Sequence, residues 1–385
     1  MRSIRDIPIL QNIPVLVRTA LNVPIKNGRV MGDYRLRRAL PTIQYLRERG
    51  ARVILISHIG EKGTETLAPV AEALGKLIPN VSFCPDTIGA TARSAIRNLA
   101  PGNILVLENL RRNRGEVEND KAFAKELAAL ADVFVEDCFD TSHRVHASIV
   151  SVPELLPSYA GFLLEEEVAE LSRALTPAHP ALAVVGGAKF GTKEGVLTKL
   201  LETYDHVFVG GALANDFLKV SGQEVGKSLV SSGNDDGIKK LLTSKKLIIP
   251  IDSLVVPANA PHSLNMRAQA RLAMTDVRPD EVILDHGPAT SALLASFVSS
   301  AKTILWNGPL GKYEDGFTDA TDALATAIAG SGAHSVVGGG DTITSIENLH
   351  LLPKFSFVST GGGAMLEYLA HGTLPGIEAL DSGGA

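Results

Sequence analysis

The run Gly338–Thr342 places three glycines and an aspartate between an apolar stretch, 334–337, and a helical pattern that we expect over Ile343–Leu349. Glycines at such a junction let backbone N–H groups approach an anion, and the N-terminus of the following helix adds the positive end of its dipole. Asp341 would repel a bare phosphate but suits a phosphate that arrives with Mg²⁺. The run therefore indicates a metal–nucleotide site, the alternative being a tight turn whose aspartate only caps the helix.

Cationic side chains of the first half follow the ends of expected strands or open the first long helix. Because the carboxyl ends of parallel strands face one crevice, these side chains are expected to converge there. Arginine can hold a carboxylate or phosphate through two hydrogen bonds, so the set predicts a basic pocket for a small, multiply anionic substrate. For any single arginine of this set, the favoured interpretation is a solvent-exposed loop residue without a binding role. The set comprises Arg18, Arg35, Arg37, His58, Arg111, Arg112, Arg114, His143, Arg144 and His146.

The second half contains two lysines, Lys189 and Lys193, within a glycine-containing turn that begins at Gly186. Both could reach a phosphate. Phosphoryl transfer depends mainly on positioning and on neutralised charge, and it needs no nucleophile on the protein. An anion pocket in one half and a nucleotide site in the other therefore indicate a kinase that closes about a hinge.

Short apolar runs alternate with longer helical patterns along the whole chain, which predicts parallel sheets with helices on both faces. A length of 385 residues favours two domains. A helical pattern with the acidic run Glu165–Glu167 reads as a connection between them. The expected helices of the first half are 33–49, 67–77 and 122–130. The expected strands are 14–18, 53–56, 104–107, 133–135, 182–185, 207–209, 247–249, 303–306 and 335–337.

Composition excludes several classes of protein. A net charge of -5 argues against a general binder of nucleic acid or membrane surfaces. Cys84 and Cys138 lack metal-ligand spacing and favour a reducing compartment. We expect no signal peptide, because the N-terminus lacks a long apolar run, and no membrane span, because no apolar stretch reaches about 18 residues. The expected location is the cytoplasm.

The chain resembles the phosphoglycerate kinase family along nearly its whole length. The resemblance is carried by many short segments in the same order and at the same spacing. These segments are Val15–Arg18, Asn22–Pro24, Arg35, Ala39–Ile43, Ser57–Gly60, Leu107–Arg111, His143–His146, Ala160–Leu163, Gly186–Lys189, Trp306–Pro309, Gly338–Thr342 and Ser359–Ala364.

The resemblance implies an α/β fold of two Rossmann-like, doubly wound parallel-sheet domains joined by a hinge helix. The implied divisions are an N-terminal phosphoglycerate-binding domain, 1–158, a hinge helix, 159–172, and a C-terminal nucleotide-binding domain, 173–370, with the tail, 371–385, packing back on the first domain. The implied reaction moves a phosphoryl group reversibly between 1,3-bisphosphoglycerate with ADP and 3-phosphoglycerate with ATP, in glycolysis and gluconeogenesis. Mg²⁺ is the implied metal, and a cytoplasmic monomer that binds neither nucleic acid nor membrane is the family default.

The resemblance also implies roles for individual residues. Arg35, Lys189 and Lys193 would act on the transferred group, and Asp341 would reach the metal. The implied phosphoglycerate ligands are Asn22, Arg35, His58, Arg111 and Arg144. The implied nucleotide ligands are Lys189, Lys193, Asn307, Pro309, Glu314, Gly339, Gly340, Asp341 and Thr342.

The chain departs from the family pattern at four places. Ala20 stands where the family has an aspartate that meets the substrate hydroxyl, and Glu61 stands where it has an arginine that contacts the substrate phosphate. Asp140 replaces a glycine, and Gly191-Thr192 replaces a Ser/Ala-Asp pair. Losing a buried charged partner costs roughly 2–5 kcal/mol, so the change at Glu61 bears directly on substrate affinity.

Two resolutions of the reversed charge at Glu61 are open. Lys62, Arg112 or Arg114 could supply the missing positive charge, or Glu61 could pair with an arginine and leave a pocket for a different acid. The chain is accordingly interpreted as a phosphoglycerate kinase with a rearranged substrate pocket. The alternatives are a related kinase for another small carboxylate or phospho-acid, and a non-catalytic nucleotide-binding paralogue. Nucleotide base preference, oligomeric state and the extent of domain closure do not follow from the sequence.

Overall fold

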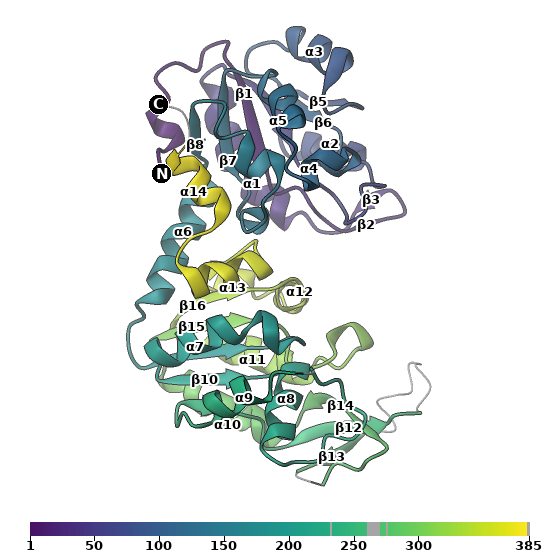
Figure 1. The fold of residues 1–385 in the computed structure, drawn as a ribbon, viewed down its shortest axis with the longest axis vertical. Helices are drawn as coiled ribbons and strands as arrows, with labels where there is room; N and C mark the ends of the chain where they lie inside the picture. The colour runs from purple at the N-terminus through teal and green to yellow at the C-terminus, as the bar shows by residue number, and fades with distance from the viewer. Residues whose placement is uncertain (232, 260–269, 275, 383–385) are drawn as a thin grey trace. The chain divides into compact units, whose positions relative to one another are not determined.

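The computed structural model describes residues 1–231, 233–259, 270–274 and 276–382, which form two compact units (Figure 1). The first unit consists of Met1–Ala169 together with the C-terminal residues from Thr373 onward, and the second of Glu170–Gly372. The division falls within helix α6, Phe162–Leu175. Each unit therefore has its own sheet and its own core.

The first unit is built on a parallel sheet of six strands whose central strand, β1 (Pro14–Thr19), is buried along its entire length. Val17 lies opposite Leu55 on one side and Val135 on the other. A strand covered on both faces needs apolar side chains in both directions, which explains the continuous apolar run. The strand order is β5 (Val81–Cys84), β6 (Ile104–Leu107), β4 (Arg52–Ile56), β1, β7 (Val133–Asp137) and β8 (Ser158–Ala160).

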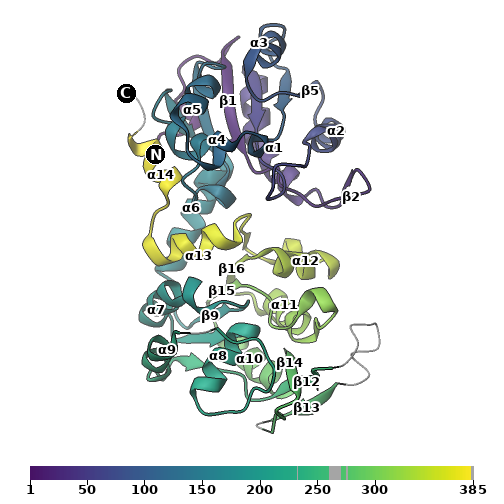
Figure 2. The same ribbon diagram turned by 45° about the vertical axis from the view of Figure 1, so that its right-hand side comes forward.

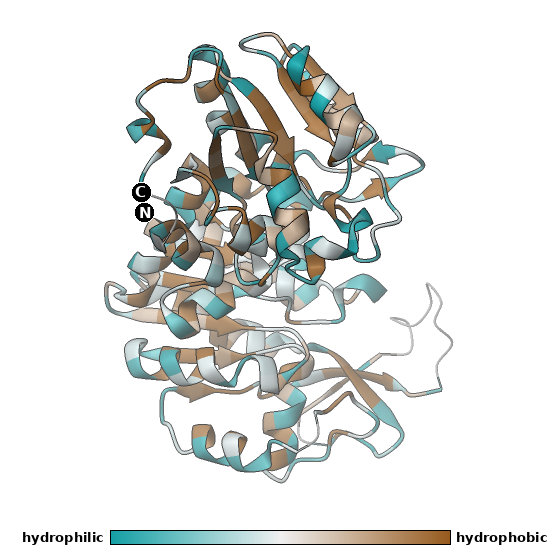
Figure 3. Cartoon of the chain, turned by 45° about the horizontal axis from the view of Figure 1, so that its top comes forward, coloured by the Kyte–Doolittle hydropathy of each residue, from teal (hydrophilic) through white to brown (hydrophobic). Residues whose placement is uncertain are grey.

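Helices of the first unit bury one apolar face each. Helix α1 (Tyr34–Glu48) directs Leu36, Ala39, Ile43 and Leu46 into the main core, at the three- and four-residue spacing of an amphipathic helix. Figure 3 shows the apolar strands beneath these mixed helices. The other elements of this unit are α2 (Ala68–Leu77), α3 (Gly89–Arg97), α4 (Arg114–Val117), α5 (Lys121–Ala128) and a hairpin of β2 (Ile25–Lys26) and β3 (Arg29–Val30).

The second unit repeats this plan with its own six-stranded parallel sheet. Its strand order is β11 (Leu247–Ile248), β10 (His206–Val209), β9 (Ala181–Val185), β15 (Thr303–Asn307), β16 (His334–Gly338) and β17 (Phe357–Val358). Its helices are α7 (Glu194–Thr203), α8 (Ala212–Val220), α9 (Asp235–Leu242), α10 (Pro288–Ser300), α11 (Asp319–Ser331), α12 (Gly340–Asn348) and α13 (Gly362–His371). The fold is thus α/β with two Rossmann-like domains, as the sequence predicted.

Two features of the second unit differ from the sequence-based expectation. An antiparallel sheet in the order β13 (Arg271–Ala273), β12 (Ser253–Pro257), β14 (Glu281–His286) interrupts the parallel pattern. Strands β12 and β14 contain the short apolar runs Leu254–Val256 and Val282–Leu284, which the sequence analysis did not include among the expected strands. Helix α12 begins at Gly340 rather than at Ile343, because its apolar spacing starts one turn after its first helical residue.

The C-terminal helix α14 (Pro375–Ser382) belongs to the first unit and lies beside the N-terminus (Figure 2). The Gly376 N–H donates to the Ser142 carbonyl at 2.9 Å, and the amino group of Met1 pairs with the Asp381 carboxylate at 2.9 Å. A side chain at Gly376 would meet Ser142 and Ile149, so glycine permits this close approach. Within the part of the chain that the structure describes, no helix has the length and apolarity to span a membrane.

Candidate active site

Arg18 and His58 form the buried base of a cationic cluster in the first unit. Arg18 is fully buried at the end of β1 and donates to Nδ1 of His58, with 3.1 Å between the nitrogens, and to the Ser148 hydroxyl at 3.0 Å. Because a guanidinium can only donate, Nδ1 of His58 must accept and its proton must lie on Nε2. Burial, and then the positive charge of the neighbouring Arg18, lowers the pKa of His58 to about 2. His58 is therefore a neutral N–H donor at physiological pH.

Arg111 is engaged by the loop that follows β4. Its side chain is 2% exposed, and Nη1 donates to the Gly60 carbonyl at 2.5 Å and to Oε2 of Glu61 at 3.1 Å. Gly60 has a φ of +66°, a conformation that favours glycine and turns its carbonyl toward Arg111. Glu61 thus neutralises a cation that the resemblance assigned to the substrate.

Substitute cations for the charge lost at position 61 are mostly committed elsewhere. Arg112 pairs with Glu108 at 3.0 Å, and Arg114 pairs with Glu118 at 2.5 Å. Lys62 makes no ion pair among the described residues. Of the two resolutions considered from the sequence, the structure shows the pairing of Glu61 with an arginine.

A second carboxylate, Asp140, holds Arg35. Their Oδ2 and Nη1 atoms lie 3.0 Å apart, and the same guanidinium nitrogen donates to the Asn22 carbonyl at 2.6 Å. The Cys138 thiol donates to Oδ1 of Asp140 at 2.8 Å. Burial alone would raise the pKa of Asp140, but the positive charge of Arg35 and the hydrogen bond from this thiol lower it to about 2. Asp140 is therefore ionised at neutral pH.

The remaining predicted acid-binding residues belong to the same cluster. The Asn22 side chain accepts from the Gly60 N–H at 3.1 Å, which ties the end of β1 to the loop that carries Glu61. Arg144 is half-buried and makes no ion pair with a carboxylate among the described residues. Its charge contributes to lowering the pKa of Arg111, after burial. The structure thus brings Asn22, Arg35, His58, Arg111 and Arg144 into one electrostatically connected group.

Ala20 lies beside this cluster without taking part in it. It is fully buried and packs against Cys138 and Leu163. Position 20 thus carries an apolar side chain where the family has a carboxylate. A different carboxylate, Asp140, is connected to Ala20 through Cys138, which packs against Ala20 and donates to Asp140.

Three glycine turns of the second unit meet where β9, β10 and β15 end. Gly211 has a φ of +64°, and a Cβ atom there would lie 2.9 Å from backbone atoms of Gly187 and of Pro309. Only glycine allows the three turns to approach so closely. The meeting point lies at the carboxyl edge of the parallel sheet, where ligands bind in open α/β folds.

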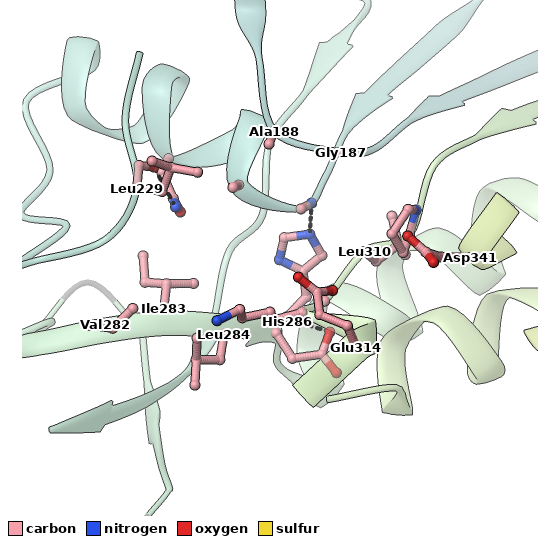
Figure 4. A pocket seen from close by; sticks show the side chains of 17 residues that line it. Gly187, Ala188, Leu229, Val282, Ile283, Leu284, His286, Leu310, Glu314 and Asp341 are labelled. Carbon is pink, nitrogen blue, oxygen red and sulfur yellow. Dashed lines mark hydrogen bonds between the residues drawn. The ribbon is translucent and has the colours of Figure 1, made fainter. Parts of the chain in front are cut away.

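A cavity of about 350 Å³ opens beside these turns (Figure 4). Pro309, Glu314 and Asp341, all predicted nucleotide ligands, line it. Its other walls are largely apolar and include Leu229, Val282, Ile283, Leu284 and Leu310. An apolar cavity with a few polar groups at its rim is typical of a small-molecule site.

Other predicted nucleotide residues lie outside the lining of the cavity. Asn307 is buried and donates to the Gly362 carbonyl at 3.1 Å, so it contacts the first residue of α13. The Nζ atom of Lys193 lies 3.4 Å from where a Cβ of Gly187 would stand, which places its ammonium near the glycine turns. Burial, and then the charge of Lys189, lowers the pKa of Lys193. Within the described chain, Lys189 and Lys193 pair with no carboxylate.

The first turn of α12 carries Asp341 and Thr342. Burial and the charge of Glu314 raise the pKa of Asp341. Thr342 is fully buried, and its hydroxyl has no hydrogen-bond partner among the described residues. Asp341 offers a carboxylate oxygen, the donor that Mg²⁺ takes together with substrate phosphates. No group of three or more His, Cys, Asp or Glu side chains suited to a metal occurs in the described residues.

The sequence analysis missed His286 and Asn215, which also line the cavity. His286 ends β14, a strand of the antiparallel sheet that the sequence analysis did not predict, and Asn215 lies on the buried face of α8. The segment Asp285–Pro288, a strand end followed by glycine and a helix-opening proline, was the available signal for His286.

Comparison with known proteins agrees with this geometry. A model of the family described as phosphoglycerate kinase matches residues 4–372. The chain belongs to the phosphoglycerate kinase family. It is 41% identical to a phosphoglycerate kinase of Pelotomaculum thermopropionicum, with 98% of each chain covered, and 43% identical to that of Azorhizobium caulinodans, with 95% and 96% covered.

Solved structures show the same relationship. The structure of phosphoglycerate kinase from Coxiella burnetii matches with a TM-score of 0.81 at 40% identity, covering 98% of both chains. That of Pyrococcus horikoshii matches with a TM-score of 0.88 at 30% identity, covering 99% of both. The family indicated by the sequence motifs is confirmed, and the chain is a phosphotransferase.

Proposed function

We propose that the chain transfers a phosphoryl group reversibly between 1,3-bisphosphoglycerate with ADP and 3-phosphoglycerate with ATP. The family match over residues 4–372 carries this proposal. A cationic cluster in one unit and an apolar cavity beside glycine turns in the other support it, since they suit an anionic acid and a nucleotide respectively. None of these observations favours the alternatives of another acid kinase or a non-catalytic paralogue.

On the acid side, we assign substrate binding to Asn22, Arg35, His58, Arg111 and Arg144. Neutral His58 would donate a hydrogen bond from Nε2, while the arginines would neutralise carboxylate and phosphate charge. Anionic substrate must compete with Glu61 for Arg111 and with Asp140 for Arg35. The pocket would therefore bind 3-phosphoglycerate more weakly than one without these carboxylates.

On the nucleotide side, Lys189 and Lys193 would contact the phosphates and the transferred group. The proposed ligands at the rim and turns are Asn307, Pro309, Glu314, Gly339, Gly340, Asp341 and Thr342. The orphaned Thr342 hydroxyl at the start of α12 suits a phosphate oxygen. Asp341 would hold Mg²⁺, which when bound with nucleotide supplies positive charge against the phosphates.

Arg35 and the two lysines would together offset the negative charge that develops on the transferred group. Phosphoryl transfer is served by positioning and electrostatic stabilisation, so these three cations can account for catalysis without a covalent intermediate. We further propose a hinge at residues 159–172 between the domains, and a cytoplasmic monomer acting in glycolysis and gluconeogenesis.

A coupled steady-state assay with Mg-ATP and 3-phosphoglycerate, titrated to high substrate, tests the proposed activity. Saturable turnover, with a high Michaelis constant for the acid, is the expected result. Absence of turnover at saturating 3-phosphoglycerate, together with turnover on another small acid, would overturn the assignment of the acid substrate.

A further inference from the structure

His286 presents an unsatisfied donor at the cavity wall. The residue is 6% exposed, and its Nε2 accepts from the Gly211 N–H at 3.2 Å. Burial lowers the pKa of His286 to about 4, so the ring is neutral and carries its single proton on Nδ1. Nδ1 has no hydrogen-bond partner among the described residues. Figure 4 shows this nitrogen directed toward the side of the cavity bounded by Leu229 and Ile283.

Asn215 presents an unsatisfied acceptor at the same side. It is 2% exposed, and its Nδ2 donates to the Leu229 carbonyl at 3.0 Å. That bond fixes the orientation of the amide, so Oδ1 is left as the acceptor, and it too has no partner among the described residues. A buried polar atom without a partner destabilises the free protein, and a ligand that satisfies it gains the corresponding affinity.

We propose that Asn215 and His286 read the nucleobase and select adenine. This inference rests on the proposed placement of the nucleotide in this cavity. Adenine carries a 6-amino donor beside a ring-nitrogen acceptor, N1 or N7, which matches the Asn215 acceptor and the His286 donor. The apolar walls cover the two faces of the ring.

Guanine fits the same two groups less well. Its O6 and N7 are both acceptors, so on that edge one of them would face the acceptor of Asn215. On its other edge O6 and N1–H could satisfy the pair, but the 2-amino group would then be left among apolar side chains without a partner. A pyrimidine would leave part of the apolar cavity unfilled.

The test on the unaltered full chain is calorimetric titration with ADP and its analogues. Purine riboside diphosphate lacks the 6-amino group, and 7-deaza-ADP and 1-deaza-ADP each lack one ring acceptor. We expect about tenfold weaker binding without the 6-amino group and a similar loss for one of the two deaza compounds. Binding of ADP, GDP and purine riboside diphosphate within about twofold of one another would overturn the proposal.

Two variants test whether Asn215 and His286 are the residues that recognise the base. Asn215→Leu should bind ADP and purine riboside diphosphate equally, and His286→Phe should remove the discrimination against the sensitive deaza compound. His206→Phe is the matched control, because His206 packs against Phe297 outside the cavity lining. This variant should keep both preferences, for ADP over purine riboside diphosphate and for ADP over the sensitive deaza compound. The proposal would be contradicted if Asn215→Leu still preferred ADP over purine riboside diphosphate and His286→Phe still preferred ADP over the sensitive deaza compound.

Turnover with 3-phosphoglycerate, measured on the same preparations, separates this inference from the proposed function. Normal turnover without base discrimination removes only the assignment of Asn215 and His286. Base discrimination without turnover on any acid supports the assignment and removes only the proposed reaction. If a variant fails to fold, the analogue series on the unaltered chain still decides.

Discussion

At the scale of single residues, two carboxylates govern the charge of the cluster proposed to bind the acid. Glu61 reaches Arg111 from an exposed loop, and Asp140 holds Arg35 from a buried one. Both partners are cations that we propose bind the anionic substrate. The apparent affinity for substrate therefore depends on how readily phosphate or carboxylate displaces these two side chains.

Replacing Glu61 by arginine should lower the Michaelis constant for 3-phosphoglycerate by about tenfold. The change frees Arg111 and adds a cation beside it, and the exposure of Glu61 leaves room for a longer side chain. Glu118→Arg is the matched control, because it reverses the same charge at a pair formed with the exposed Arg114. An unchanged or raised constant in Glu61→Arg would show that the positional match to the family misleads at this loop.

At the scale of elements, an aspartate lies at each of two helix N-termini, and Asp341 is exposed whereas Asp137 is buried. Asp341 lies in the first turn of α12 beside the glycine turns of the second unit. In the first unit Asp137 caps α6, since its Oδ1 accepts from the backbone N–H groups of Leu163 at 2.9 Å and Leu164 at 3.4 Å. One aspartate is open to a ligand and the other is enclosed, so removing each should have a different consequence.

Asp341→Ala should reduce kcat by at least about tenfold and raise the Mg²⁺ concentration needed for half-maximal rate, because the metal loses a positioning carboxylate. Steady-state rates across a Mg²⁺ titration measure both quantities. Thr344→Ala, on the exposed part of the same helix, is the control and should behave as the unaltered chain. A normal Mg²⁺ dependence in Asp341→Ala would refute the proposed metal role.

Asp137→Asn should flatten the pH dependence of stability. Burial raises the pKa of Asp137 from 3.8 to about 7, against opposing hydrogen bonds. The folded state therefore binds this proton more tightly than the unfolded state, so stability is full below 3.8 and falls by up to about 1.4 kcal/mol per pH unit until about pH 7. Asparagine removes this titration.

Urea unfolding followed by circular dichroism at about pH 5 and pH 7 measures the difference. Between these two pH values the unaltered chain should lose more unfolding free energy than Asp137→Asn, because only the unaltered chain has the titrating carboxyl. Asp120→Asn is the control, because Asp120 caps α5 from an exposed position and should follow the unaltered chain. Parallel pH profiles for Asp137→Asn and the unaltered chain would contradict the assignment.

At the scale of the whole molecule, the first unit is completed by residues from the far end of the chain. In this C-terminal segment Leu374, just before helix α14, and Ile377 and Leu380 within the helix are buried. The second unit, in contrast, is continuous in sequence and contains the single tryptophan, Trp306, which is fully buried. The two units can therefore be followed separately during unfolding.

Leu380→Ala should destabilise the first unit by about 3 kcal/mol, the usual cost of truncating a buried leucine. In urea, circular dichroism should show an earlier transition while the transition reported by Trp306 fluorescence keeps its midpoint. Leu155→Ala, at an exposed position of the same unit, should change neither. An equal shift of both transitions in Leu380→Ala would show that the two units unfold as one.

Local signals in the sequence were enough to determine the fold class and the family. Apolar runs such as that of β1 report strands buried on both faces, because every residue of such a strand contacts the core. Glycine clusters after strands mark turns that need positive φ or close backbone approach, as at Gly211. These features depend on neighbouring residues only, so they can be seen before folding.

Tertiary structure alone decided which charges are available. The pairing of Arg111 with Glu61 joins loops after different strands, and the pairing of Arg35 with Asp140 joins residues more widely separated in sequence. The neutral state of His286, and its unsatisfied nitrogen, arise from packing between an antiparallel strand and a glycine turn. Such properties follow from burial and from distant contacts, which no local pattern in the sequence encodes.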